Sequence, residues 1–82
     1  MPTIKKGRTN NPEVHFNEIE IQILIFTHKF GLLANKTLLL ELDYLGLSID
    51  EATLRSVIDD LIRYFNRPIV GCAQVAKERG II

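Results

Sequence analysis

Apolar residues recur at helical spacing most clearly in residues 49–65. Ser48 and Glu51 have the spacing of a capping box at the start of this segment, and Asn66-Arg67-Pro68 interrupts the pattern at its end. Charged and polar residues occupy the remaining faces. The sequence therefore predicts a long amphipathic helix, whose apolar stripe is formed by Leu54, Val57, Ile58, Leu61, Ile62 and Phe65.

Residues 17–31 combine two periodic patterns. Residues 18–23 alternate strictly between polar and apolar side chains, and isoleucine favours strands. Against a strand, Asn17 is a good N-cap, Glu20 follows three residues later as in a capping box, and Gly31 is a natural helix end. We predict a helix over residues 17–31, with a core-facing stripe formed by Ile19, Ile23, Phe26 and Phe30.

The segment between these two helices is rich in good helix formers. Asn35 can cap a helix and Gly46 can end it, which predicts a second helix over residues 35–45. Residues 1–16 contain two prolines and three basic residues with little periodicity, which is typical of a flexible basic arm. The chain is therefore divided into an arm, residues 1–16, and one domain, residues 17–82.

The end of the chain changes its pattern after the helix-breaking Pro68. The run Pro-Ile-Val-Gly-Cys-Ala over residues 68–73 predicts a strand, residues 74–79 a turn, and residues 80–82 the beginning of a returning strand. The sequence thus predicts a small β-hairpin after the third helix.

The order helix, helix, tight turn, longer helix and hairpin resembles that of winged helix-turn-helix domains. The resemblance covers about residues 17–82 and consists of residue classes rather than an invariant signature. It implies a mainly α fold with a small β-hairpin, in which the third helix enters the DNA major groove and the wing and arm contact the backbone. Four segments carry the likeness. They are the start of the first helix (Glu20–Leu24), the turn (Leu45–Ser48), the recognition helix (Leu54–Arg63) and the wing (Pro68–Gly71 with Gly80–Ile81).

Ten basic and ten acidic residues give a formal net charge of zero, which argues against a protein that coats nucleic acid. The charge is unevenly distributed. Residues 1–16 and 67–82 each have three basic residues and one acidic residue, whereas residues 17–66 have four basic and eight acidic. Positive charge thus occurs in the arm and the wing, which favours contacts with DNA phosphates. Asp50 and Glu51, in the first turn of the third helix, oppose such contacts.

Our leading hypothesis is a small transcriptional regulator that binds double-stranded DNA. Arg55 can form a bidentate hydrogen bond with guanine. An i,i+4 ion pair with Asp59 at the surface would account for an arginine at this position equally well. The arm can equally be a solvated tail. The predicted DNA-binding residues are Lys5, Lys6, Arg8, Thr53, Arg55, Ser56, Arg63, Arg67, Lys77 and Arg79.

Helix 17–31 has a second apolar face opposite its core stripe, which is unusual for a surface helix of a monomer. This face predicts an interface for a homodimer or another protein, unless the helix is buried from two sides. The alternative function is therefore a protein-interaction module of winged-helix shape that does not bind DNA. The predicted interface residues are Ile21, Leu24, Ile25 and His28.

The sequence contains no pattern typical of catalysis or metal binding. His15, His28 and Cys72 lack metal-ligand spacing, and no serine or cysteine has a base nearby in the sequence. The isolated glycines form no phosphate-binding loop, and adjacent Asp59 and Asp60 diverge by about 100° on a helix. We predict neither an enzyme nor a cofactor, metal or small-molecule site.

Cys72 is the single cysteine, so nothing indicates a disulfide or an oxidising compartment. The N-terminal residues lack the apolar run of a signal peptide. The longest apolar runs, residues 23–26 and 38–40, are far shorter than the roughly 20 residues that span a bilayer. We therefore expect a cytoplasmic protein that does not enter a membrane, with Cys72 as a small buried side chain.

Overall fold

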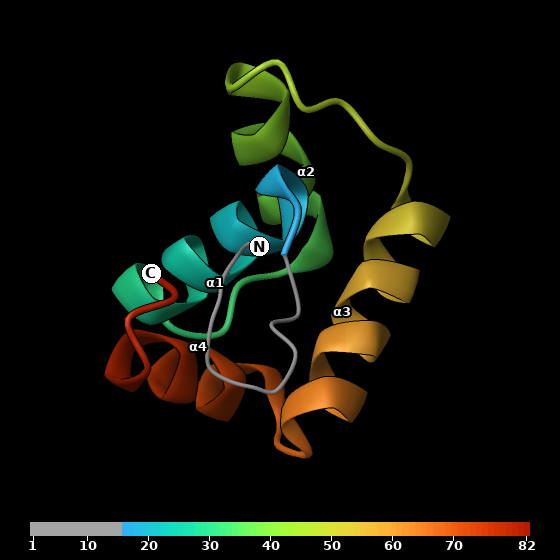
Figure 1. The fold of residues 1–82 in the computed structure, drawn as a ribbon. Helices are drawn as coiled ribbons and strands as arrows, with labels where there is room; N and C mark the ends of the chain where they lie inside the picture. Colours follow the sequence, from blue (N-terminus) through green and yellow to red (C-terminus); the bar gives the residue numbers. More distant parts are fainter. Residues whose placement is uncertain (1–15) are drawn as a thin grey trace, which may run out of the picture.

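Four helices make up most of residues 16–82, the part of the chain that the computed structural model describes (Figure 1). They are α1 (Glu18–Phe30), α2 (Asn35–Tyr44), α3 (Glu51–Phe65) and α4 (Ile69–Glu78). The predicted basic arm, with Lys5, Lys6 and Arg8, lies outside the described residues, apart from Phe16 at its end.

The capping signals at the start of α1 decide its structure. The Asn17 side chain accepts a hydrogen bond from the Glu20 N–H at 2.8 Å, and the Glu20 carboxylate accepts one from the Asn17 N–H at 2.8 Å. At the other end, Gly31 has a φ of 82° and its N–H donates to the Thr27 carbonyl. The predicted helix is confirmed. The capping box satisfies backbone N–H groups at the start of the helix, and it outweighs the alternating pattern that favours a strand.

The other two predicted caps are wrong by one or two residues. Ala34, and not Asn35, is the N-cap of α2. Asp50, and not Ser48, is the N-cap of α3, where its carboxylate accepts a hydrogen bond from the Thr53 N–H at 2.7 Å. Both Ser48 and Asp50 are good capping residues, and the later start leaves Ile49 free to pack against the core.

Helices α2 and α4 each end in the same hydrogen-bonded motif with glycine at the position of positive φ, and α3 does so with Asn66. After α2, Gly46 has a φ of 78° and the Leu47 N–H donates to the Leu42 carbonyl at 2.9 Å. After α4, Gly80 has a φ of 75° and the Ile81 N–H donates to the carbonyl of the residue five positions earlier. After each glycine this Schellman motif turns the following apolar side chain back onto the core.

Within residues 16–82, the core lies between the four helices and is built from ten buried hydrophobic side chains. The most extensive contact joins α1 and α4, which run side by side in Figure 1, while α3 packs against each of the other helices. Burying side chains of the size of leucine or isoleucine stabilises the fold by about 1.5–3 kcal/mol each. The buried set is Ile23, Leu24, Leu38, Leu42, Leu54, Leu61, Phe65, Cys72, Ala73 and Ala76.

The predicted β-hairpin is wrong, because residues 16–82 contain helices and no strand. Pro68 precedes the first turn of α4, and the predicted strand and turn together form one helix. Ile69, Cys72, Ala73 and Ala76 follow the i, i+3, i+4, i+7 spacing of a helix face, and the last three are fully buried. Tertiary burial of this face overrides the strand preference of residues 69 and 70. The fold is therefore all-α over the described residues and has no wing.

None of the individual helices within residues 16–82 combines the length and apolar character needed to cross a bilayer. Only α1 and α2 taken together meet that criterion, and they are bent by 118° at their junction.

Gln74→Pro distinguishes a helix from a wing at residues 69–78. Gln74 is exposed in the middle of α4, so proline there removes a helical hydrogen bond and should lower the free energy of unfolding by about 3 kcal/mol. Gln74→Ala is the control and should change it by less than about 0.5 kcal/mol. Urea denaturation followed by circular dichroism measures both, and equal stability of the proline variant and the wild type would exclude a helix here.

Candidate nucleic-acid interface

The outer face of α3 exposes the four residues of this helix that were predicted to contact DNA. Its inner face supplies core residues, and in Figure 1 the helix forms one edge of the molecule. Ser56 and Arg63 are seven residues apart, so they lie on one line along the helix, about 10 Å apart. Thr53 and Arg55 lie on the two flanks of this line.

Both arginines of α3 form exposed ion pairs with neighbours on the same helix. Arg55 contacts Glu51 at 3.2 Å, and not Asp59 as the sequence hypothesis had it, while Arg63 contacts Asp60 at 2.9 Å. All four side chains are more than half exposed. Exposed pairs of this kind contribute about 0.2–1 kcal/mol, so neither arginine is held strongly in place.

The first turn of α3 is negatively charged. The Thr53 side chain and backbone N–H donate hydrogen bonds to the Asp50 carboxylate and lower its pKa, so this group is ionised at neutral pH. Glu51 adds a second negative charge in the same turn. The beginning of α3 therefore repels phosphates, and Thr53 already uses its N–H for the cap.

The C-terminal end of α3 has a different character, because aromatic and basic side chains meet there. The Phe16 ring centroid lies 5.3 Å from that of Tyr64 and 5.7 Å from that of Phe65. The Arg79 guanidinium lies 5.8 Å from the centre of the Phe65 ring, within the range of a cation–π contact. Arg67 follows directly in the turn that ends α3. Arg63 in the last turn of α3, Arg67 just after the helix and Arg79 over the Phe65 ring thus all lie near the C-terminal end of α3, where Arg63 is paired with Asp60.

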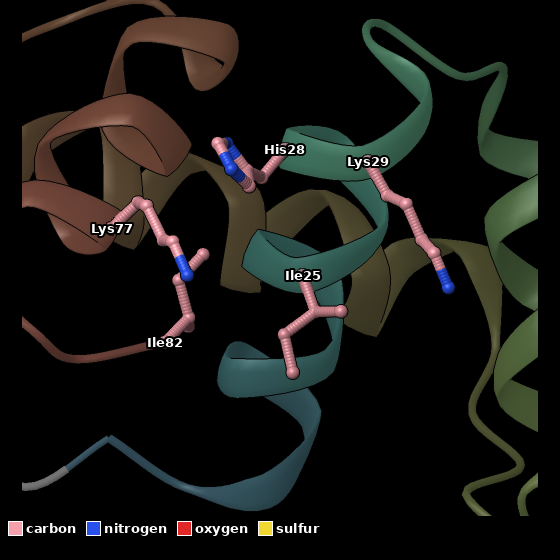
Figure 2. A pocket seen from close by; sticks show the side chains of 5 residues that line it. All are labelled: Ile25, His28, Lys29, Lys77 and Ile82. Carbon is pink, nitrogen blue, oxygen red and sulfur yellow. The ribbon is translucent and has the colours of Figure 1, made fainter.

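Lys77 is separated from this group and lies beside the end of α1. It lines a shallow pocket of about 240 Å³ with Ile25, His28, Lys29 and Ile82. Figure 2 shows Lys77 and Ile82 on one side of the pocket and Ile25 on the other, while the Lys29 side chain extends away from it. The volume is below the range of about 300–1,000 Å³ that is typical of small-molecule sites.

The predicted interface on α1 is divided between core and surface. Leu24 is fully buried within a single chain, so it is not available to a partner. Ile21 and Ile25 are half-buried and His28 is exposed. The extensive packing of α4 on α1 accounts for the second apolar face, which matches the alternative of burial from two sides.

Tyr64 was not selected from the sequence, although it is 47% exposed next to the basic group. Tyr64 falls outside the apolar stripe of α3, next to the core residue Phe65, and no pattern in the sequence marks its ring as part of a site. Its exposure and its edge-to-face contact with Phe16 are seen only in the structure.

Cys72 is a structural side chain. It is fully buried, and its thiol donates to the carbonyl oxygens of Leu61 at 3.5 Å and Arg67 at 3.3 Å. Burial raises the pKa of the thiol, which opposes formation of a reactive thiolate. Within residues 16–82, no group of histidine, cysteine, aspartate or glutamate side chains is arranged to hold a metal ion.

No protein-family model, curated protein or solved structure matches this chain.

The lowered pKa of Asp50 predicts how stability changes with pH. The cap stabilises the fold above the ordinary pKa of 3.8, and this contribution is lost as the pH falls through the lower folded value. The stability difference between wild type and Asp50→Ala, measured by urea denaturation, should therefore shrink below about pH 4. Asp50→Asn against Asp50→Ala, two variants that cannot titrate at this position, should show a constant difference. If the stability difference between wild type and Asp50→Ala does not change with pH, the lowered pKa of Asp50 is contradicted.

Leu24→Glu tests whether this residue belongs to the core. The substitution buries a carboxylate without a partner, and we expect it to lower the free energy of unfolding by about 3 kcal/mol or more. His28→Glu changes the exposed end of the same face and should cost less than about 0.5 kcal/mol. Thermal denaturation followed by circular dichroism compares the two. If the Leu24→Glu variant is as stable as the wild type, Leu24 does not belong to the core.

Proposed function

We propose that this protein binds duplex DNA through α3, with its phosphate contacts concentrated at the C-terminal end of that helix. The observation that supports this proposal is the grouping of Arg63, Arg67 and Arg79 at one end of an exposed helix. Arginine side chains hold phosphates through charge-assisted hydrogen bonds, and these contacts supply most of the affinity for DNA.

The shape of α3 suits a groove. B-DNA has a major groove about 12 Å wide, which admits one α-helix. The line formed by Ser56 and Arg63 faces the groove in our proposal, and Thr53 and Arg55 on its flanks reach toward base edges. Arg55 is the candidate for guanine, because its exposed pair with Glu51 is weaker than the 1–3 kcal/mol of a good bidentate base contact.

The acidic first turn of α3 determines the direction of approach. Asp50 and Glu51 repel phosphates, so the helix binds with its N-terminal end farther from the backbone than its C-terminal end. This arrangement differs from a winged helix, in which the first turn enters the groove most deeply. It also leaves Lys77 outside the proposed contact, since Lys77 lies beside α1.

The basic arm joins the described chain at the same end of α3. Lys5, Lys6 and Arg8 precede Phe16, whose ring packs against Tyr64 and Phe65. We propose that these three charges contact the backbone or the minor groove next to the α3 site. A cytoplasmic transcriptional regulator is the biological role that this mode of binding favours.

Single charge removals test the proposed docking. Arg63→Gln and Arg67→Gln should each weaken binding to mixed duplexes and lower the slope of log affinity against log salt by about 1. Lys29→Gln removes the same charge from the end of α1 and should leave that slope unchanged. Fluorescence anisotropy at a series of salt concentrations measures all three. Equal losses in the three variants would exclude a site at α3, and no binding of the wild type at low salt would exclude DNA as the ligand.

A protein-interaction module is the second candidate function. It is favoured by large apolar side chains that remain exposed on α2 and next to it, among them Leu40 and Tyr44. Binding through such a surface responds little to salt, whereas DNA binding weakens steeply, so the same titration separates the two functions.

A further inference from the structure

The two tyrosines of the chain lie in opposite electrostatic surroundings. Tyr44, at the end of α2, is 85% exposed; Asp43 precedes it and Glu41 lies one turn earlier on the same helix. Tyr64, in the last turn of α3, is 47% exposed and follows Arg63 directly. An exposed aromatic ring beside cationic side chains is the combination with which proteins bind unpaired nucleotides, because the ring stacks on a base and the cations hold the phosphates.

Two other rings hold the Tyr64 ring in a defined orientation. Its centroid lies 5.3 Å from that of Phe16 at an interplanar angle of 84°, and 4.9 Å from that of Phe65 at 89°. Phe65 is buried in the core, and Phe16 packs against the core from outside α3. These edge-to-face contacts are favourable and leave much of Tyr64 exposed. A base that stacks on Tyr64 therefore meets a ring that is already positioned, which lowers the entropic cost of binding.

The two arginines next to this aromatic group are positioned by their non-polar parts. The Arg79 guanidinium lies 5.8 Å from the centre of the Phe65 ring. The stem of Arg67 lies against Gly71, where a Cβ atom would be only 3.2 Å from the Arg67 Cβ and 3.5 Å from its Cδ. Within residues 16–82, neither arginine belongs to an ion pair. Their guanidinium groups are therefore available for phosphates close to the Tyr64 ring.

We propose that the DNA bound by this protein has an unpaired segment next to the duplex, and that a base of this segment stacks on the Tyr64 ring. The inference rests on the proposed function of α3 and names the class of DNA that the site takes. Inside a duplex both faces of a base are covered by neighbouring base pairs, so the ring needs a nucleotide that has left the stack. Arg67 and Arg79 then hold phosphates at the junction between the duplex and the unpaired segment.

The Tyr64 hydroxyl offers a different contact, which the experiment must separate from stacking. A tyrosine hydroxyl can donate a hydrogen bond to a phosphate of an ordinary duplex. Tyr64→Phe removes this donor and keeps the aromatic ring, whereas Tyr64→Leu removes both and keeps an apolar side chain. Stacking therefore predicts that only the leucine variant loses the preference for unpaired DNA.

Fluorescence anisotropy at low salt compares a blunt duplex with a forked duplex of the same paired sequence, whose two strands end in short runs of unpaired thymidines. We expect the wild type to bind the fork at least about fivefold more tightly. Tyr64→Leu should abolish this preference, and Tyr64→Phe should retain it. Tyr44→Leu is the matched control, because Tyr44 is also exposed at the end of a helix but lies beside carboxylates, and it should leave the preference unchanged.

Intrinsic fluorescence gives a second readout that does not depend on a variant at position 64. The chain has two tyrosines and no tryptophan, so Tyr44→Phe makes Tyr64 the sole source of this emission. A base that stacks on the ring quenches it, so saturation with the fork should quench more strongly than saturation with the blunt duplex. Circular dichroism verifies that each variant is folded.

Four results would overturn the proposal: equal affinity for fork and blunt duplex, a preference that survives Tyr64→Leu, a preference that is lost in Tyr64→Phe, or equal quenching by the two DNAs. If the wild type binds the blunt duplex in these cases, the proposed function of α3 is unaffected. A wild type that binds neither DNA at low salt overturns the proposed function, and this inference with it.

Discussion

The packing of α4 on α1 is the contact on which the rest of the structure depends. The buried face of α4 consists of the small side chains Cys72, Ala73 and Ala76, and small residues let two helices approach closely. This contact covers part of α1, on which Ile23 and Leu24 are both fully buried. Without α4, α1 would expose a hydrophobic face that a domain of this size has little other surface to cover.

The position of α4 also determines where the basic side chains lie. A wing would hold Arg67, Lys77 and Arg79 together on one hairpin. A helix separates them instead: Arg79 reaches the Phe65 ring at the end of α3, whereas Lys77 lies next to His28 at the end of α1. The proposed DNA-binding end of α3 is therefore a product of tertiary structure, assembled from the ends of α3 and α4 and from the aromatic contacts of Phe16.

Two surfaces with different physical properties result. The outer face of α3 is polar, and its ion pairs are exposed and weak, so its interactions depend on salt. Helix α2 exposes Leu40 and Tyr44, and interactions of these side chains depend on apolar burial.

Local signals in the sequence determined the first three helices. The capping box of Asn17 and Glu20, the glycine after α1 and the apolar stripe of α3 each specify backbone hydrogen bonds or one buried face within a few residues. Only tertiary structure decided that residues 69–78 form a helix. The free energy gained by burying Cys72, Ala73 and Ala76 on one helix face exceeds the strand preference of Ile69 and Val70. It likewise decided which apolar residues are exposed. Leu24 and Leu40 both belong to apolar segments, and only the packing of other helices makes one a core residue and leaves the other at the surface.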